Sequence, residues 1–387
     1  MNVLIFVTHL LGAGHLSRAL TLGRAFAAAG HRVTLASGGM PAPQLDHAGL
    51  TLVQLPPLRA DGTNFTRLLD AGGDVAQEAL FKARRAALLS LLTPAPDILI
   101  TELFPFGRRV LSEEFLTLLQ AASGLPRPPV TLASIRDILA PPSKPAKAVR
   151  ADEIITQYYD GVFVHSDPQT TVLAQSWPVS ETLRPRLHYT GYVAPPAAGP
   201  HPDHPGEGEI LVSAGGGTVG QALFETAIKA ARLMPDHRWR LLIGGSDAGE
   251  RIAALQGLNP SETTRIEPAR ADFRHMLYHV AASVSMCGYN TALDLLQAGT
   301  PAVLVPFDDG HEVEQTLRAK SLSRMGAMQV LPSAALTPRA LCDGLARVMS
   351  QGRRDATGLR FDGARRSVEI AVEMAVGSVV GSAGART

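Results

Sequence analysis

The chain of 387 residues contains only two cysteines, Cys287 and Cys342. Two thiols are too few for the disulfide framework of a small secreted domain, so the sequence predicts a protein of the reducing cytoplasm. Excess charge is also absent, because 36 Lys and Arg residues against 35 Asp and Glu residues give a net charge of +1. Such a chain has no overall attraction for nucleic acid, and an anionic ligand would have to be bound locally.

Long hydrophobic runs and a secretion signal are missing as well. No stretch reaches the ~18 consecutive apolar residues of a membrane-spanning helix, so any contact with the inner membrane face is expected to be peripheral. The N-terminal apolar run lacks a basic region and a cleavage site, and His15 and Arg18 interrupt it. It therefore predicts a β-strand. Hydrophobic residues at 45% and charged residues at 18% predict a globular core.

Continuous apolar runs recur along the first half of the chain and predict buried strands. The absence of alternation with polar residues is typical of parallel strands that helices cover on both faces. The runs lie at 2–7, 32–36, 97–101, 130–134 and 161–166. Helical patterns at 75–92 and 108–122 separate some of them, so we predict a doubly wound α/β domain over residues 1–193.

A Pro-rich segment at 194–208 lacks periodicity and predicts a linker between domains. After it, the succession of strand, glycine-rich turn and helix begins again. We predict a second domain over 209–375 and a flexible tail at 376–387. The predicted fold class is α/β, with two Rossmann-like doubly wound parallel-sheet domains that face each other across a cleft. Residues that directly follow strands are the ones expected to bind a ligand.

The first candidate site follows the first predicted strand. Gly12 and Gly14 open the turn, and His15 begins a helix whose N-terminus favours a neutral, proton-accepting imidazole. Glu102 ends another strand at the same edge of the sheet, where its carboxylate would hold one imidazole nitrogen while the other takes a proton. The alternatives are a capping or interface histidine and a glutamate in an ordinary salt bridge.

A run of glycines forms the second candidate site. Gly215, Gly216 and Gly217, followed by Thr218, lie between a predicted strand and a predicted helix. Consecutive glycines let backbone N–H groups approach an anion near a helix N-terminus. The run lacks the Lys-Ser/Thr ending of a P-loop and the GxGxxG fingerprint of dinucleotide sites. It predicts either a phosphate-binding loop of another kind or a tight turn.

The segment 286–320 carries the most informative pattern. Gly288 opens a turn after a strand, and Asn290 and Thr291 place short polar groups at a helix start, where a diphosphate would lie. One helical turn later, Asp294 shares their face, the position from which a carboxylate binds two ribose hydroxyls. The pattern therefore predicts a nucleotide site.

Together these motifs resemble those of two-domain (GT-B) glycosyltransferases, in the MurG-like family 28 and the UDP-glycosyltransferase superfamily. The stretch CGYNTALDLLQAGTPAVLVPF, with Glu314 and Gln315 downstream, is similar to their nucleotide-sugar signature. GAGH, which ends at His15, resembles their glycine-histidine loop, and ITELFPFG around Glu102 resembles their strand that ends in an acid.

The resemblance implies a role for each matching residue. His15 would be the catalytic base and Glu102 would orient it, while Gly12, Gly14 and Phe104 are expected near the acceptor. In the donor site, Asp294 is expected to contact the ribose, and Glu314 and Gln315 to contact the sugar. Gly288 forms the turn before the helix. The residues expected to contact phosphate are Gly215, Gly216, Gly217, Thr218, Asn290 and Thr291.

The sequence departs from the plant-type pattern where a histidine contacts phosphate, because Met286 stands there. Arg270, in the loop expected near the base, is our candidate for balancing the phosphate charge, against the alternative of a surface arginine. No DxD-type acid pair occurs in a donor loop, so no metal is expected.

The predicted function is that of a metal-independent inverting glycosyltransferase. It would move a hexose or N-acetylhexosamine from a nucleoside-diphosphate sugar, expected to be a UDP-sugar, to an acceptor hydroxyl. The sugar nucleotide is a co-substrate, and no further cofactor is expected. The alternatives are an enzyme like UDP-N-acetylglucosamine 2-epimerase, which needs no acceptor, and a non-catalytic scaffold that binds a nucleotide sugar and has no use for an oriented base.

The class of acceptor stays open between a small molecule, a glycan and a lipid-linked molecule. Residues 56–93 are apolar and carry Lys82, Arg84 and Arg85, which fits either a peripheral membrane patch or an amphipathic helix with solvated basic residues. The apolar stretch at 103–106 lines either an acceptor pocket or the core.

Overall fold

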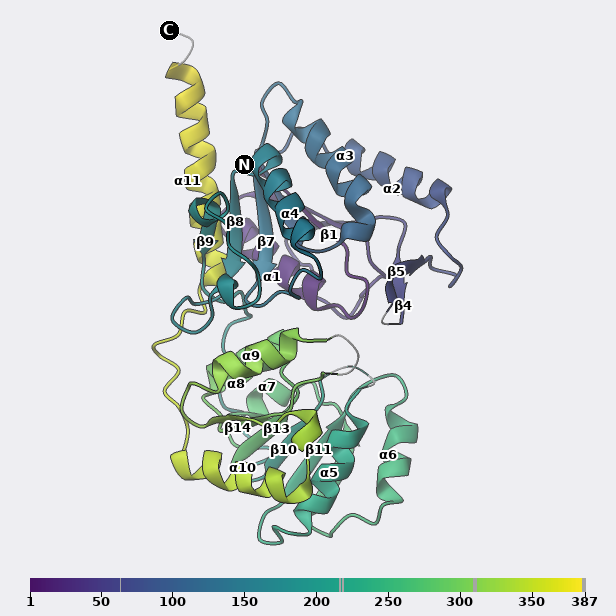
Figure 1. Cartoon of the computed structure of the whole chain (residues 1–387), viewed down its shortest axis with the longest axis vertical. Coiled ribbons are helices and arrows are strands. Elements are labelled where there is room, and N and C mark those ends of the chain that lie inside the picture. Colours follow the sequence, from purple (N-terminus) through teal and green to yellow (C-terminus); the bar gives the residue numbers. More distant parts are fainter. Residues whose placement is uncertain (63, 216, 218, 309–311, 385–387) are drawn as a thin grey trace. The chain divides into compact units, whose positions relative to one another are not determined.

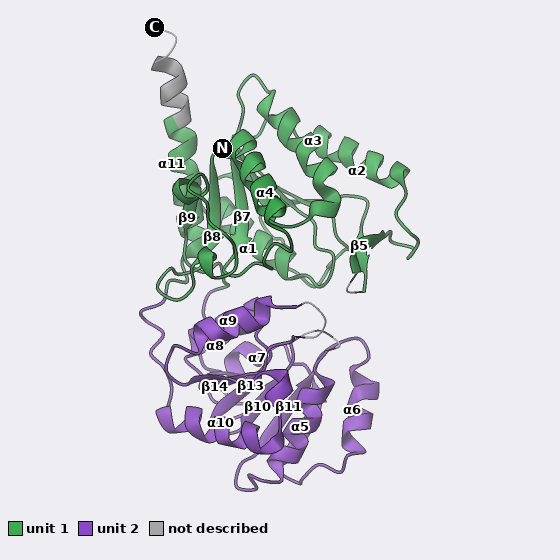
Figure 2. Ribbon diagram, viewed as in Figure 1, with its two compact units in different colours: residues 1–195, 360–387 green, residues 196–359 purple. Residues whose placement is uncertain are grey.

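Two parallel β-sheets, each in a compact unit of its own, form the computed structural model of the chain (Figure 1). The structure describes residues 1–62, 64–215, 217, 219–308 and 312–384. Figure 2 colours the first unit, residues 1–195 and 360–387, green and the second unit, residues 196–359, purple. The predicted α/β class with two parallel-sheet domains is confirmed.

The sheet of the first unit has seven parallel strands in the order β3-β2-β1-β6-β7-β8-β9. These strands are β1 (Asn2–Val7), β2 (Arg32–Ser37), β3 (Thr51–Gln54), β6 (Ile98–Glu102), β7 (Val130–Arg136), β8 (Gly161–His165) and β9 (Leu187–Tyr189). A separate antiparallel hairpin consists of β4 (Arg59–Asp61) and β5 (Asn64–Leu69). The five apolar runs identified in the sequence are confirmed as strands, whereas the sequence analysis missed β3, β9 and the hairpin.

Helices cover both faces of this sheet because successive side chains of a strand point to opposite faces. Val3 and Ile5 of β1 belong to a core that includes residues of α1 and α11, whereas Leu4 and Phe6 belong to a second core that includes residues of α2, α3 and α4. The helices are α1 (Gly14–Ala28), α2 (Glu78–Ser90), α3 (Ser112–Ser123), α4 (Pro145–Tyr158) and α11 (Gly363–Gly384), with 3-10 turns at Arg109–Leu111, Leu173–Gln175 and Arg184–Arg186.

The second unit repeats the arrangement with six parallel strands in the order β12-β11-β10-β13-β14-β15. The strands are β10 (Ile210–Ser213), β11 (Trp239–Ile243), β12 (Thr264–Pro268), β13 (Ala282–Ser285), β14 (Ala302–Leu304) and β15 (Met328–Val330). The helices are α5 (Gln221–Ala231), α6 (Ala248–Gln256), α7 (Phe273–Met276), α8 (Tyr289–Ala298), α9 (Glu314–Leu322) and α10 (Pro338–Gln351), with a 3-10 turn at Ser333–Ala335.

Both sheets have a switch point beside the first strand of the unit. The next strands in sequence are added on one side of this strand, and the later ones on its other side. In the first unit, β1 pairs with both β2 and β6, and in the second unit, β10 pairs with both β11 and β13. Open α/β sheets bind ligands outside the carboxyl ends of the strands at such a point. The segments after β1, β6, β10 and β13 are therefore the places to look for a site.

The domain boundaries predicted from the sequence need correction at the C-terminal end. Residues 360–375 were assigned to the second domain, but α11 contacts α1 and β7 in the first unit. Its buried residues Val368 and Ala371 join the core of β1 and α1. The predicted flexible tail at 376–387 begins within α11, which continues to Gly384, and residues 385–387 lie outside the described residues.

The predicted linker at 194–208 also differs, because most of it packs against the second unit. The backbone N–H of His201 donates to Nε2 of His279 at 2.8 Å, and the N–H of Gly208 donates to the carbonyl of His279 at 3.1 Å. His204 stacks on the His279 ring with 4.4 Å between centroids. The segment has no regular secondary structure, as predicted, but it belongs to the second unit.

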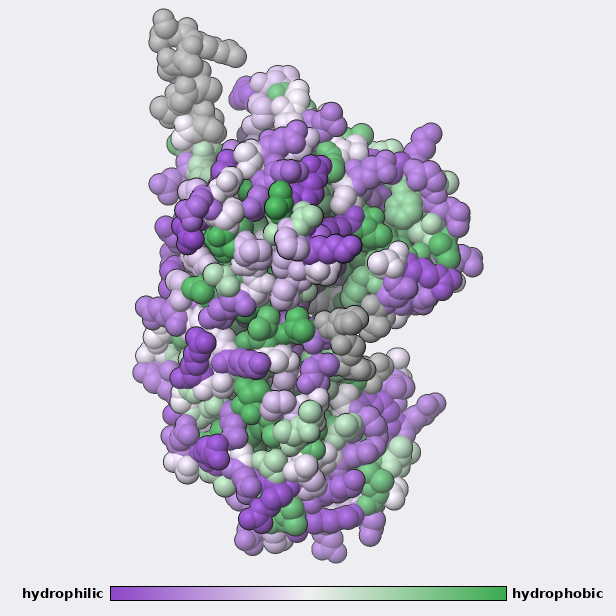
Figure 3. All heavy atoms as spheres, in the orientation of Figure 1, coloured by the Kyte–Doolittle hydropathy of each residue, from purple (hydrophilic) through white to green (hydrophobic). Residues whose placement is uncertain are grey.

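Arg84 and Arg85, two of the three basic residues of the suggested membrane patch, are paired within the first unit. Arg84 of α2 is fully buried, and its Nε and Nη2 donate to the two carboxylate oxygens of Glu114 at 2.7 and 2.8 Å. Arg85 forms ion pairs with Glu78 and Glu113. Arg84 is therefore not a solvated residue of a patch, and Figure 3 shows hydrophilic and hydrophobic residues intermixed over the visible face. No helix in the described ranges is both long and apolar enough to span a bilayer.

The place of α11 predicts the effect of a buried charge on it. Ala371 is fully buried and Val376 is 50% exposed on the same helix. Ala371→Asp should destabilise the first unit by about 3 kcal/mol, because the carboxylate has no partner in an apolar core. Val376→Asp is the control and should change little. Hydrogen exchange of peptides from β1 and β7 measures the effect, and faster exchange confined to 209–359 would contradict this assignment.

Candidate active site

The structure brings His15 and Glu102 together at the switch point of the first unit. His15 lies in the first turn of α1, directly after the turn that follows β1, and Glu102 is the last residue of β6. Nδ1 of His15 lies 2.8 Å from Oε1 of Glu102, and their side chains are 12% and 2% exposed. An ionised carboxylate only accepts hydrogen bonds, so Nδ1 carries the proton and Nε2 has a lone pair.

Two further side chains hold Glu102, and the sequence analysis missed both in this role. Arg18, three residues after His15 on the same face of α1, forms an ion pair with Oε1 of Glu102. Ser134 on β7 is paired with Glu102 in the sheet, and its hydroxyl donates to Oε2 at 2.7 Å. The spacing of three between His15 and Arg18 is the signal that would have indicated the first of these contacts.

The electrostatics of the pair favour a neutral imidazole and an ionised carboxylate. Burial lowers the pKa of His15 well below its usual value, and the charges of Arg108 and Arg136 lower it further. The hydrogen bond that Nδ1 of His15 donates to Glu102 raises this pKa but does not outweigh the burial. Burial alone would raise the pKa of Glu102, but the charge of Arg18 and the hydrogen bonds from His15 and Ser134 hold that pKa below its usual value. His15 is therefore ready to accept a proton at neutral pH.

The residues predicted near the acceptor divide into two groups. Gly12 has a positive φ of 62° in the turn before α1, and Gly14 is the first residue of that helix, so both lie beside His15. The preceding residue, Leu11, is 56% exposed. Phe104, in contrast, is 1% exposed and stacks on Phe115 with 4.6 Å between ring centroids. The assignment of Phe104 to the acceptor site is therefore corrected: it is a core residue.

The glycine run after β10 lies at the switch point of the second unit, and Gly216 and Thr218 fall outside the described residues. Apart from the glycine itself and its chain neighbours, no described atom lies within 4 Å of where a Cβ would be on Gly215 or Gly217, so no described side chain covers the backbone there. Gly220 precedes α5 with a φ of 95°, a conformation that favours glycine.

Arg251 of α6 contacts the glycine-rich turn with its guanidinium, a contact that was not predicted from the sequence. Its guanidinium donates to the carbonyl oxygens of Val219 at 2.9 Å and Gly244 at 3.1 Å. The predicted phosphate partner, Arg270, instead donates from Nε and Nη2 to the two carboxylate oxygens of Asp272, at 2.8 and 2.7 Å. The charge of Arg270 is thus already balanced on its own loop.

The turn at Gly288 leads into α8, as the sequence predicted. Gly288 is the N-cap, Asn290 is exposed and Thr291 is half-buried, so two polar side chains lie at the N-terminus of the helix, where the helix dipole favours an anion. Oδ1 of Asp294 accepts from Nε of Arg274 at 2.8 Å. Burial raises the pKa of Asp294 to about 6, while Arg274 opposes the shift. A ribose contact by Asp294 stays a prediction, and it would have to share the carboxylate with Arg274.

Gln315 joins the two turns that follow β13 and β14. Its Oε1 accepts from the backbone N–H groups of Cys287 at 3.0 Å and Phe307 at 3.1 Å. Glu314 is the first residue of α9, and Arg318, 1% exposed on the same helix, donates to the carbonyl of Cys287 at 3.1 Å. The helix α9 thereby supports the turn at Gly288. Contact of Glu314 and Gln315 with a sugar stays a prediction.

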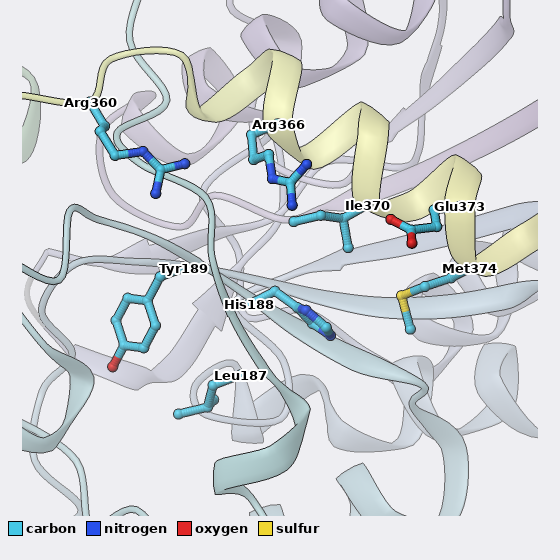
Figure 4. Close-up of a pocket in the computed structure, with 8 residues that line it drawn as sticks. All are labelled: Leu187, His188, Tyr189, Arg360, Arg366, Ile370, Glu373 and Met374. Carbon is cyan, nitrogen blue, oxygen red and sulfur yellow. The ribbon is translucent and has the colours of Figure 1, made fainter.

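A cavity of about 700 Å³ lies elsewhere in the first unit, between β9 and α11 (Figure 4). Its lining residues are Leu187, His188, Tyr189, Arg360, Arg366, Ile370, Glu373 and Met374. None of them belongs to the predicted site. Among the described residues, no group of three or more histidine, cysteine, aspartate and glutamate side chains is placed to hold a metal ion.

The buried neutral state of His15 predicts a pH-dependent stability. Below its usual pKa of 6.5, His15 takes up a proton in the unfolded chain but not in the folded one, so its contribution to stability is lost as the pH falls. As the pH falls from 6.5 to about 5, the reduction in the slope of unfolding free energy against pH caused by His15→Gln should rise from ~0.7 to ~1.4 kcal/mol per pH unit. Denaturant unfolding measures the slope. His47→Gln, which replaces an exposed histidine of the same unit, should retain the original slope, and equal slopes in both variants would contradict this account.

Comparison with known proteins supports the resemblance seen in the sequence. Residues 211–362 match the glycosyltransferase family 28 C-terminal domain. The UDP-N-acetylglucosamine–N-acetylmuramyl-(pentapeptide) pyrophosphoryl-undecaprenol N-acetylglucosamine transferase of Rhodospirillum rubrum is 30% identical over 138 residues, 35% of this chain and 36% of that protein. The enzyme of the same name from Gloeobacter violaceus is 28% identical over 179 residues, 44% and 49% of the two chains. The chain thus spans about a third to a half of the length of these relatives.

Solved structures match over nearly the whole chain. The calicheamicin glycosyltransferase CalG4 aligns with a TM-score of 0.63 at 19% identity and covers 98% of both chains. MurG of Acinetobacter baumannii aligns with a TM-score of 0.63 at 16% identity, over 96% of this chain and 100% of that one. At such identities the likeness shows the fold. The chain has the two-unit GT-B fold of these glycosyltransferases, and its residues 211–362 match the glycosyltransferase family 28 C-terminal domain.

Proposed function

We propose that this protein is a metal-independent, inverting glycosyltransferase. It moves a hexose or an N-acetylhexosamine from a UDP-sugar to a hydroxyl group of an acceptor. The observation that carries the proposal is the hydrogen bond of 2.8 Å between Nδ1 of His15 and Oε1 of Glu102 at the switch point of the first unit. A general base is what an acceptor hydroxyl requires, and a non-catalytic scaffold has no need of one.

In this proposal the first unit supplies the base. Nε2 of His15 removes the proton of the acceptor hydroxyl, and Glu102 stabilises the imidazolium that forms. The acceptor lies over the turn at Gly12 and Gly14, and the exposed side chain of Leu11 contacts its apolar part. Arg18 keeps Glu102 ionised through the reaction, since its charge holds the pKa of that carboxyl below its usual value.

The second unit binds the donor. The diphosphate lies over the first turn of α8, after Gly288, and over the glycine-rich turn before α5, where backbone N–H groups and two helix N-termini favour negative charge. Arg251 stabilises the second of these turns through the carbonyl of Val219. A UDP-sugar is the donor that the family 28 domain favours, since UDP-N-acetylglucosamine is part of the name of its relatives.

The chemical step is a direct displacement at the anomeric carbon. The acceptor oxygen forms a bond to this carbon as its proton passes to Nε2 of His15. The bond between the anomeric carbon and the phosphate oxygen breaks, and UDP leaves with the electron pair. Attack opposite the leaving group inverts the configuration. The N–H groups at the two helix N-termini stabilise the charge that develops on the diphosphate.

Replacement of the base tests the catalytic role of His15. His15→Ala should lower kcat on the order of 10³-fold, the usual contribution of a positioned general base. The KM for the donor should change little, because the donor is held by the other unit. Product formation from a UDP-sugar measures both constants. His47→Ala, at an exposed histidine, is the control, and a wild-type kcat in His15→Ala would refute the base assignment.

Binding of the nucleotide tests the donor site separately. UDP at a concentration of 100 times its Kd should stabilise the protein by ~2.7 kcal/mol. Asn290→Asp places a negative charge at the start of α8 and should abolish this stabilisation by repelling the diphosphate. Thermal unfolding with UDP, GDP and dTDP measures the effect, and Gln256→Glu, at an exposed position of α6, is the charge-matched control. A larger shift with GDP or dTDP would contradict the choice of UDP, and no shift at all would contradict the donor site.

A further inference from the structure

A chain of buried polar side chains continues from Glu102 across the sheet of the first unit. Oε2 of Glu102 accepts from the hydroxyl of Ser134 at 2.7 Å, and this hydroxyl oxygen lies 3.0 Å from Nε2 of His165. Nδ1 of His165 lies 2.8 Å from the hydroxyl of Thr190. All of these side chains are at most 2% exposed. They come from β6, β7, β8 and the residue after β9.

These residues take the place of core residues at the carboxyl ends of their strands. The preceding residues with the same orientation are apolar: Ile100 before Glu102, Leu132 before Ser134, and Phe163 before His165. Buried polar groups in such positions are costly unless each has a hydrogen-bond partner. This series of hydrogen-bonded side chains therefore indicates a role that apolar side chains at the same positions could not fill.

The directions of the hydrogen bonds follow from the ionised state of Glu102. A carboxylate only accepts, so Ser134 must donate to it and can only accept from His165. Burial lowers the pKa of His165 well below its usual value, so its ring is neutral, with the proton on Nε2 and a lone pair on Nδ1. Nδ1 then accepts the hydroxyl proton of Thr190, for which the carbonyl of Gly191 at 2.8 Å is the competing acceptor. If Ser134 instead donated its proton to His165, lone pairs of the Ser134 hydroxyl and the Glu102 carboxylate would face each other at 2.7 Å.

Arg18 competes with His15 for Glu102. Nη2 of Arg18 contacts Oε1, the same oxygen that His15 uses, and lies 3.2 Å from Nδ1 of His15. An arginine and a carboxylate prefer a pair of parallel hydrogen bonds, which would take both oxygens of Glu102. In that arrangement Arg18 could also donate to Nδ1, and the proton of His15 would move to Nε2. Such a histidine cannot accept a proton from a substrate at Nε2.

We propose that Ser134 and His165 are positioning residues that hold Oε2 of Glu102 away from Arg18 and thereby keep the lone pair of His15 on Nε2. The proposal rests on the function proposed above, because it explains how the base is kept in its active tautomer. Neither residue touches a substrate. Their effect passes through the orientation of one carboxylate.

A pair of variants with the same shape isolates the hydroxyl group of Ser134. Ser134→Thr keeps the hydroxyl and Ser134→Val lacks it, so a packing effect of the added methyl groups is common to both. Relative to Ser134→Thr, Ser134→Val should have a kcat about tenfold lower, the loss expected for one hydrogen bond to a charged group, with the same KM for the donor. The acid limb of its pH profile should move to lower pH, because His15 loses its carboxylate partner. Equal kcat values and pH profiles in the two variants would overturn the proposal.

A measurement without catalysis separates this proposal from the proposed function. The ¹⁵N chemical shifts of the His15 ring, assigned with His15→Gln, report which nitrogen carries the proton. They should show the proton on Nδ1 in the unchanged protein and in Ser134→Thr, and on Nε2 in Ser134→Val. Identical shifts in the two variants would overturn the proposal. A difference in shifts from a protein that transfers no sugar would support it and contradict the proposed function.

Two further variants serve as a second test and a control. His165→Gln retains an N–H donor for Ser134 and should keep the His15 tautomer, whereas His165→Leu removes the donor and should shift it. Thr101 precedes Glu102 on β6 and bonds the hydroxyl of Tyr159 at 2.7 Å on the other face of the sheet. Thr101→Val should leave the His15 tautomer unchanged. A tautomer shift in Thr101→Val as large as that in Ser134→Val would count against the proposal.

Discussion

The buried charge of Glu102 is the constraint on which the edge of the first unit depends. A carboxylate that is 2% exposed is unfavourable unless charged or hydrogen-bonding partners compensate for the lost water. Here α1 contributes His15 and Arg18, and β7 contributes Ser134. His15 and Arg18 both contact the same oxygen of Glu102, which requires the first turn of α1 to lie directly beside the end of β6. The need to compensate one charge thus fixes the start of the helix and, with it, the orientation of the imidazole.

If His15 is the base, as proposed, this arrangement favours the orientation of the base over its strength. A carboxylate partner usually raises the pKa of a histidine, but Arg18 balances the charge of Glu102, and burial together with Arg108 and Arg136 lowers the pKa of His15. The imidazole stays neutral over a wide pH range, at the expense of proton affinity. Such a base is suited to accepting a proton late, when the oxygen of the acceptor has begun to bond to the sugar and has become more acidic.

The strands and turns, which depend on short segments of the sequence, were predicted. Contacts between segments that are far apart in the sequence were not. Apolar runs and glycine turns marked the strands and switch points, and the ends of β1 and β6 led to His15 and Glu102. The same patterns could not show that α11 returns to the first unit, because an apolar helix face fits either core. Ion pairs such as Arg274 with Asp294 join residues from separate helices, and no local pattern announces them. Phe104 was ambiguous for a related reason: an apolar residue after a strand suits a pocket as well as a core.

The two units use the same topological position with different chemistry. At the switch point of the first unit, between β1 and β6, titratable side chains meet, and their protonation states follow from burial and charge. At the switch point of the second unit, between β10 and β13, glycines leave the backbone accessible, and the polar groups are N–H donors at helix starts. Backbone N–H groups keep their protons at any pH at which the protein is folded, which suits an anion whose charge must be held constant. A base has to change its protonation state in every cycle, which only a side chain can do. The division between side-chain chemistry in one unit and backbone chemistry in the other is therefore what the proposed transfer from a diphosphate to a hydroxyl requires.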